Sequence, residues 1–254
     1  MLVPEAYLDD SGTYGGSVVA VIAGYVGPAS EWELLETRWN AFLDREDLDY
    51  YHSVDAAHQQ KQFNGRTPQA CNLLHREAVE MITERQLVPV GAAVRIAGFE
   101  KRYEVERRKA ELAHPLIKLT PLPKAYFYQV YDWVMHYLGN YMKVQAPDEK
   151  LSVLCEDTPE VMGLTQQLHS WLLENYQEEL SPYFAGPPAF RPKIGYPQVQ
   201  AADVLAYEMG LSLTRHFGNS ERRMRGSWQA LNDHAVKVTP GGDPFIWCQP
   251  WDEN

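Results

Sequence analysis

Apolar and polar positions alternate along this chain in a way that predicts strands and helices in a mixed order. Two apolar runs near the N-terminus flank Gly15-Gly16, which favours a hairpin, and later segments repeat apolar residues every three or four positions, as amphipathic helices do. The expected strands are Glu5–Leu8, Gly16–Gly27, Leu48–Ala56, Leu87–Ala97 and Lys150–Thr158; the expected helices are Ser30–Asp44, Thr67–Gln86, Lys124–Met142, Pro159–Tyr176 and Pro197–Gly218. A hairpin followed by alternating helices and strands is typical of an α/β protein with a mixed sheet.

Two of these helices carry start signals. Ser30 and Glu33 have the spacing of a capping box, and Thr67 precedes a proline that suits the first helical position. Residues 100–112 mix both charges densely, which favours either a solvated helix or a mobile loop. We expect one domain over residues 1–254, with a helical insertion at about 99–145 and a C-terminal extension at about 219–254.

The composition is that of a globular protein with an acidic balance. The 254 residues are 45% hydrophobic and 22% charged, and their formal net charge is −11. Proteins that coat nucleic acid non-specifically are usually basic, so any contact with nucleic acid must use a local basic patch. Arg222, Arg223 and Arg225 form a compact cluster that can bind backbone phosphates, although the same residues suit an ordinary solvated helix start.

Cysteine usage and apolar runs indicate the compartment. The three cysteines are widely spaced, which argues against a disulfide framework and against a cysteine-based zinc site. No run of about 18 apolar residues is present, so we expect no membrane span. The N-terminus lacks the basic and apolar regions of a signal peptide, and a reducing cytoplasm is therefore the expected location.

Acidic residues stand at three places where predicted elements begin or end. Asp9 and Asp10 end the first strand, Glu156 and Asp157 end a later strand, and Asp203 lies at the edge of the apolar face of the last long helix. Carboxylates that are buried near one another repel each other and are costly to desolvate. Mg²⁺ and Mn²⁺ prefer oxygen ligands and would remove that repulsion. Because two such ions about 4 Å apart serve phosphodiester hydrolysis, these five residues are candidate ligands of a two-metal site.

Each acidic position also has a simpler interpretation. Residues 9–12 read Asp-Asp-Ser-Gly, which is a good turn sequence. Residues 155–160 suit a loop that caps the following helix, and Asp203 can complement the dipole of its own helix. The case for a metal site therefore depends on whether the three places converge in space.

Two short motifs resemble the end motifs of a widespread prokaryotic family of unknown function. They are YLDDSG at residues 7–12 and QVQAADVLAY at residues 198–207, and YYHSVDA at residues 50–56 looks like that family's central segment. Members typically begin with an Asp-Glu-Ser-Gly strand end and close with a Gln-x-Ala-Asp helix. The resemblance implies an RNase H-like fold, a mixed sheet flanked by helices with helical insertions, and metal-dependent nuclease activity.

The resemblance also implies residue roles. Asp9 matches the strand acid that bridges both metals, and Asp203 matches the helix acid that holds one of them. Glu156 or Asp157 matches the acid at the later strand end, and the choice between them stays open. Asp10 stands where the family more often has Glu, which leaves its ligand role in doubt.

Two further sets of residues lie near the expected site. His52 and Asp55 can act as peripheral ligands or orient a water molecule beside the acids, or they can bind Zn²⁺ together with His58. Lys193 precedes the helix of Asp203 and can contact the scissile phosphate or the leaving group, or simply lie in solvent.

These patterns predict a divalent-metal-dependent nuclease or phosphodiesterase, a hydrolase with DNA or RNA as its substrate. The alternative is a non-catalytic RNase H-like binding module of a defence or mobile-element system, in which local donors hold the acids. A small-molecule phosphohydrolase with the same acids is a third possibility. The tail at residues 243–254 contains two tryptophans, which suit either a homodimer contact or packing onto the same domain.

Overall fold

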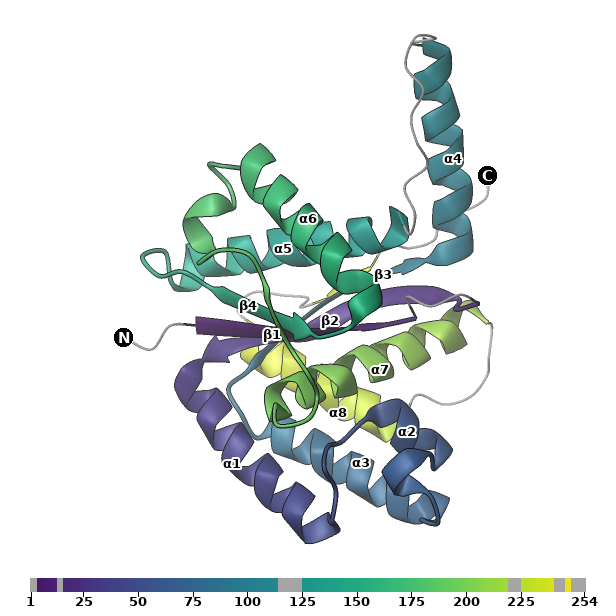
Figure 1. Cartoon of the computed structure of the whole chain (residues 1–254), viewed down its shortest axis with the longest axis vertical. Coiled ribbons are helices and arrows are strands. Elements are labelled where there is room, and N and C mark those ends of the chain that lie inside the picture. The colour runs from purple at the N-terminus through teal and green to yellow at the C-terminus, as the bar shows by residue number, and fades with distance from the viewer. Residues whose placement is uncertain (1–3, 13–15, 114–124, 219–224, 240–244, 248–254) are drawn as a thin grey trace.

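A mixed β-sheet lies at the centre of the computed structural model, which describes residues 4–12, 16–113, 125–218, 225–239 and 245–247 (Figure 1). The strand order is β5-β4-β1-β2-β3-β6. β1 (Pro4–Ser11), β2 (Val19–Pro28) and β3 (Val88–Arg95) are antiparallel neighbours. β4 (Ser152–Glu156) runs parallel to β1, β5 (Ala189–Arg191) runs parallel to β4, and β6 (Phe245–Trp247) runs parallel to β3. The expected α/β class, with a mixed sheet flanked by helices, is confirmed.

Helices cover both faces of this sheet (Figure 1). On one face lie α1 (Ala29–Glu46), α3 (Pro68–Thr83), α7 (Pro197–Phe217) and α8 (Gly226–Val238), with the short α2 (Ser53–His58) beside α3. On the other lie α5 (Ala125–Gln145) and α6 (Pro159–Asn175). α4 (Ile96–Ala113) has no buried residue and extends away from the sheet, and single 3₁₀ turns occur at Lys61–Phe63 and Ser181–Tyr183. In the described part of the chain, no helix is long and apolar enough to cross a membrane.

The alternation of side chains along the strands decides which acids face α7. In β1, Tyr7 packs into the core on the α7 side, whereas Leu8 packs into the core on the α5 side. Asp9 therefore points to the α7 side and Asp10 to the α5 side, since successive strand residues alternate. In β4, Leu154 belongs to the α7-side core, so the same alternation directs Glu156 to the α7 side.

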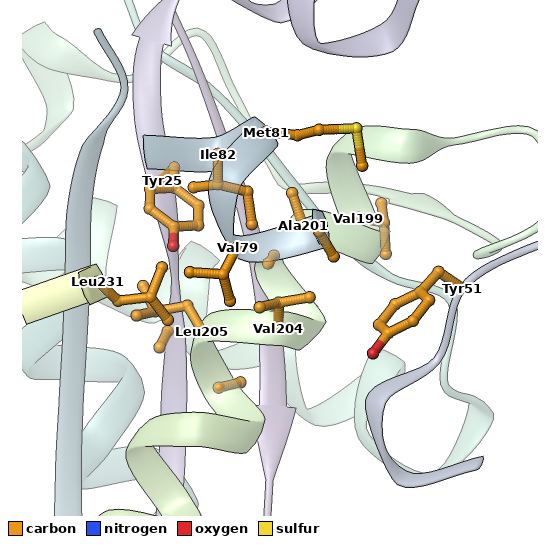
Figure 2. Packing of buried hydrophobic residues seen from close by; sticks show 14 of the residues in the cluster. Tyr25, Tyr51, Val79, Met81, Ile82, Val199, Ala201, Val204, Leu205 and Leu231 are labelled. Carbon is orange, nitrogen blue, oxygen red and sulfur yellow. The ribbon is translucent and has the colours of Figure 1, made fainter. Parts of the chain in front are cut away.

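α7 is the helix most deeply embedded in the fold. Figure 2 shows Val204 and Leu205 of α7 among side chains from the sheet, α3 and α8, including Tyr25, Val79 and Leu231. Alanine fills several of its sheet-facing positions, so the helix lies close to β1 and β2 and brings its polar residues near the strand ends.

Some expected elements are confirmed and others are wrong. Thr67 caps α3, where its Oγ1 accepts a hydrogen bond from the N–H of Ala70 at 3.2 Å. The capping box at Ser30 is wrong, because α1 already begins at Ala29 and its N-cap residue, Pro28, makes no side-chain capping bond. The dense charge mixture at 100–112 is helical, within α4, which starts directly after β3 ends at Arg95.

The strand expected at Leu48–Ala56 is also wrong. Residues 48–52 belong to no helix or strand, and α2 begins at Ser53. The backbone N–H groups of Tyr51 and Ser53 donate to side chains of α7 instead of a neighbouring strand, to Gln200 Oε1 and Asp203 Oδ2, each at 2.7 Å. This segment is therefore fastened to the region where the acids lie.

The domain boundaries stay predictions. The expected insertion at 99–145 contains most of α4 and all of α5, and α5 packs directly on β2 and β3. The expected extension at 219–254 contains α8 and β6. Arg222, Arg223 and most of the tryptophan-containing tail lie outside the described residues.

Candidate active site

The topology brings three carboxylates to one edge of the sheet. β1 and β4 are parallel, and Leu8 lies opposite Cys155, so Asp9 and Glu156 follow side by side. Asp203 lies in the second turn of α7, which packs across β1. The loop after β5 supplies Lys193, because β5 is parallel to β4 and ends at the same edge.

The ammonium group of Lys193 lies where the three carboxylates converge. Its Nζ is 2.7 Å from Glu156 Oε1, 3.2 Å from Asp9 Oδ2 and 3.5 Å from Asp203 Oδ1. Asp9 is 3% exposed and Asp203 is 5% exposed, while the side chain of Lys193 is 11% exposed. We call these four residues the carboxylate cluster.

The carboxylate cluster holds more negative charge than Lys193 neutralises. Burial raises the pKa of Asp9 well above its ordinary value, and the charges of Glu156 and Asp203 raise it further against the opposing effect of Lys193. Without a further cation, burial and the neighbouring carboxylates thus favour the protonated form of Asp9.

Their surroundings keep the other two acids ionised. Although burial acts to raise it, the pKa of Asp203 is lowered by Lys193, His52 and the N–H of Ser53. The pKa of Glu156 is likewise lowered, despite burial, by a hydrogen bond from Asp9 and by Lys193.

His52 joins Asp203 to a second acid. Its Nε2 is 3.4 Å from Asp203 Oδ1, and its Nδ1 is 2.8 Å from Asp55 Oδ2. Lys61 Nζ lies 3.0 Å from the same oxygen of Asp55. Although burial acts to raise it, the pKa of Asp55 is lowered by His52 and Lys61. Asp55 therefore lies at the Nδ1 edge of the imidazole ring, and Nε2 faces the carboxylate cluster.

A pocket of about 430 Å³ opens over the carboxylate cluster. Its walls contain Glu156, Lys193 and Asp203 from the cluster, and they also contain Asp10, Ser11, Gly12, His52, Val54, Asp157, Thr158, Pro159 and Tyr207. Gly12 has φ +73°, and an added Cβ would meet the backbone oxygen of Val19 at 2.0 Å, so glycine is required where the chain turns away from β1.

The structure separates the five predicted acidic ligands. Asp9, Glu156 and Asp203 meet around Lys193, whereas Asp10 and Asp157 line the pocket beside them. Asp10 contributes its backbone N–H to Asp9 Oδ1 at 2.7 Å. Glu156 pairs with Lys193, whereas Asp157 lines the pocket, and which of the two is a ligand stays a prediction.

The donor set of the carboxylate cluster fits a hard divalent cation in its chemistry, because it offers several oxygens and excess negative charge. In the present arrangement, however, the ammonium group takes the central position. No group of three His, Cys, Asp or Glu side chains in the described ranges is arranged to hold a metal ion. The zinc alternative at His52, Asp55 and His58 stays a prediction.

Arg225 contacts a different set of residues from the carboxylate cluster. It lines a smaller pocket of about 100 Å³ next to Tyr207, and its Nη1 is 3.2 Å from Glu208 Oε1. Tyr207 lines both this pocket and the pocket over the carboxylate cluster, so the two pockets adjoin one tyrosine.

Sequence reasoning did not assign the role of Gln200. This fully buried side chain accepts hydrogen bonds from Trp39 Nε1 at 2.8 Å and Tyr51 N at 2.7 Å, and it donates to the backbone oxygen of Lys193 at 2.7 Å. It thereby fastens the segments that carry His52 and Lys193 to α7. Its spacing of three from Asp203 on one helix face is the signal that points to it.

The comparisons with known proteins add little to this geometry. No protein-family model and no curated protein matches the chain. A chain of the PCNA:RNase HII complex from Archaeoglobus fulgidus is similar to it in structure, with a TM-score of 0.45 and 14% identity over 94% of this chain and 92% of that chain. A likeness at this level carries no argument about residues or activity, so membership of the family that the end motifs resemble stays a prediction.

Proposed function

We propose that this protein is a divalent-metal-dependent hydrolase of phosphodiester bonds in nucleic acid. The observation that carries the proposal is the convergence of Asp9, Glu156 and Asp203, from three different elements, next to an open pocket. Buried acids that serve only the fold are normally balanced by partners, whereas among the described residues Lys193 is the one lysine or arginine that pairs with these three carboxylates.

Asp9, Glu156 and Asp203 are the side chains that would hold Mg²⁺ or Mn²⁺, and Asp10 and Asp157 lie at the pocket wall beside them. When bound, such ions polarise the phosphoryl group and lower the pKa of water. The chain's own residues supply the rest: Lys193 can contact a phosphate oxygen.

His52 is the candidate for orienting a water molecule in this pocket. It lines the pocket, its Nδ1 lies 2.8 Å from Asp55 Oδ2, and its Nε2 faces Asp203 in the carboxylate cluster. Arg225 pairs with Glu208 and also lines the adjoining pocket, where it can bind a neighbouring phosphate and so localise nucleic acid on a protein with net charge −11.

One observation favours a second candidate function, a non-catalytic binding module. In such a module, the acids are held by local donors, and the contacts of Lys193, Ser53 and His52 within and beside the carboxylate cluster are donors of this kind. The two functions differ in what they predict for metal binding.

The deciding experiment compares wild type with Asp9→Asn, Asp203→Asn and the exposed control Asp44→Asn. Each protein is incubated with single- and double-stranded DNA and RNA, in Mn²⁺ or EDTA. We expect Mn²⁺-dependent cleavage by wild type and Asp44→Asn, and a loss of about a hundredfold or more in both site variants. Cleavage of nucleotides but not of polymers would indicate a small-molecule phosphohydrolase, and no cleavage together with no Mn²⁺ binding would leave the binding module.

A further inference from the structure

The position of Lys193 raises the question of how a metal ion could reach the carboxylate cluster. The ammonium group contacts one oxygen of each of three carboxylates, which come from β1, β4 and α7. Within the described residues, Lys193 is the only lysine or arginine that pairs with these acids. It occupies the position in which a bound cation would contact all three.

An ammonium group and a divalent cation cannot both use these oxygens. The three oxygens that contact Nζ are the ones that a cation would take as ligands, and both charges would then lie a few ångströms apart in a buried site. The cation prefers oxygen ligands at about 2.0–2.6 Å, closer than a hydrogen bond allows. Binding of the cation therefore requires the ammonium group to leave.

The structure allows the side chain of Lys193 to leave while its backbone stays in place. The carbonyl oxygen of Lys193 accepts hydrogen bonds from Gln200 Nε2 at 2.7 Å and from the N–H of Tyr196 at 3.2 Å. The pocket of about 430 Å³ next to the side chain gives it room. A lysine side chain is flexible enough to exchange one position for the other.

We propose that Lys193 is a placeholder for the divalent cation, and that the cation displaces its ammonium group into the pocket, where it binds a phosphate of the substrate. The inference rests on the proposed function, and it adds an order of events: the cation binds first and creates the phosphate contact. It also predicts that replacing Lys193 with an uncharged residue increases the affinity of the carboxylate cluster for the divalent cation.

The first test measures Mn²⁺ binding by calorimetry to the full chain, as wild type, Lys193→Met, Lys61→Met and Asp203→Asn. Lys61→Met is the matched control, since Lys61 pairs with Asp55 outside the carboxylate cluster. We expect Lys193→Met to bind Mn²⁺ about tenfold or more tightly than wild type, because no ion pair has to be broken. Lys61→Met should bind as wild type does, and Asp203→Asn should lose binding.

The second test needs no variant and covers the case in which Lys193→Met fails to fold. Wild-type protein is treated briefly with an amine-acylating reagent, with and without Mn²⁺, and the modified lysines are mapped by mass spectrometry. Modification of Lys193 should rise several-fold with Mn²⁺, while that of Lys61, which is already exposed, stays constant.

The outcomes separate the inference from the proposed function. Mn²⁺ binding to wild type with equal or weaker binding to Lys193→Met, or with no change in Lys193 modification, would overturn the placeholder role and leave the metal site standing. No Mn²⁺ binding to either protein would overturn both.

Discussion

Two buried polar clusters lie along α7 and differ in how their charges are balanced. The carboxylate cluster sets Asp9, Glu156 and Asp203 against one lysine. Five residues along the helix, Glu208 accepts from His75 Nε2 at 2.7 Å and pairs with Arg225 at 3.2 Å.

The second group, which we call the Glu208 cluster, also includes Tyr51, whose hydroxyl lies 2.8 Å from His75 Nδ1. It has one carboxylate and one guanidinium group, and the pKa of Glu208 is lowered by His75 and Arg225 although burial acts to raise it. In the carboxylate cluster, by contrast, burial and like charges raise the pKa of Asp9.

This difference in charge balance suggests a structural role for the Glu208 cluster and an ion-binding role for the carboxylate cluster. The Glu208 cluster pairs one carboxylate with a guanidinium group and an imidazole and fastens α3 to α7, whereas in the carboxylate cluster three carboxylates share the one lysine that the described residues place beside them. We therefore expect substitutions in the Glu208 cluster to affect folding, and substitutions in the carboxylate cluster to affect ion binding.

The largest expected effect on stability is that of Glu208→Ala. Glu208 is 1% exposed, and its removal leaves the positive charge of Arg225 and the imidazole of His75 without their partner. We expect a loss of about 3–5 kcal/mol in the free energy of unfolding, measured in urea. The control Glu77→Ala breaks a surface pair with Arg45 and should cost less than about 1 kcal/mol. Equal losses in the two variants would show that the Glu208 cluster is not structural.

Mn²⁺ should stabilise the protein through the carboxylate cluster alone. At a hundredfold excess over its dissociation constant, the ion is expected to add about 2.7 kcal/mol to the free energy of unfolding. A thermal melt with and without Mn²⁺ measures the shift, which should persist in His75→Gln and vanish in Asp203→Asn. If Asp203→Asn keeps the shift, the ion binds elsewhere and the comparison fails.

In EDTA, Asp9→Asn should be more stable than wild type, and the difference in the free energy of unfolding should grow as the pH rises. A raised pKa means that the folded protein holds a proton at Asp9 more tightly than the unfolded chain does. Asp9 therefore lowers stability as the pH climbs from about 3.9 toward its folded pKa, and the loss is complete above it.

The amide that replaces the carboxyl group cannot ionise, so Asp9→Asn should gain about 1 kcal/mol or more over wild type at pH 8 and little at pH 4. Urea unfolding at both pH values measures the difference. The same gain at both pH values would mean that relief of charge is not its cause.

The sequence predicted the carboxylate cluster better than the Glu208 cluster, for a physical reason. Asp9, Glu156 and Asp203 are recognisable because each lies near the end of a predicted strand or on a helix face, and parallel strands place their ends together. The choice between Glu156 and Asp157 depends on which face of β4 packs against α7, and a short strand does not reveal this. The central position of Lys193 depends on a loop, whose course hydrophobic periodicity does not encode.

The Glu208 cluster could not be predicted from spacing at all. Its members come from a segment expected to be a strand, from α3, from α7 and from the start of α8, and nothing in the sequence links them. The prediction of a strand at Leu48–Ala56 failed for the same reason, because backbone N–H groups of this segment bond to side chains that are far away in sequence. Long-range side-chain contacts override local propensity here.

The smallest expected effect comes from Tyr51→Phe, which tests the comparison most finely because Tyr51 belongs to the Glu208 cluster and directly precedes His52. The change removes one buried hydrogen bond, to His75 Nδ1, and keeps the ring and the backbone N–H that binds Gln200. We expect a loss of about 1 kcal/mol in urea unfolding. Mn²⁺ affinity, measured by calorimetry, should equal that of wild type, because the contact of Ser53 with Asp203 is unchanged. A change in Mn²⁺ affinity would show that the two clusters are coupled through the Tyr51–Ser53 segment, in which case the structural and the ion-binding halves of α7 act as one unit.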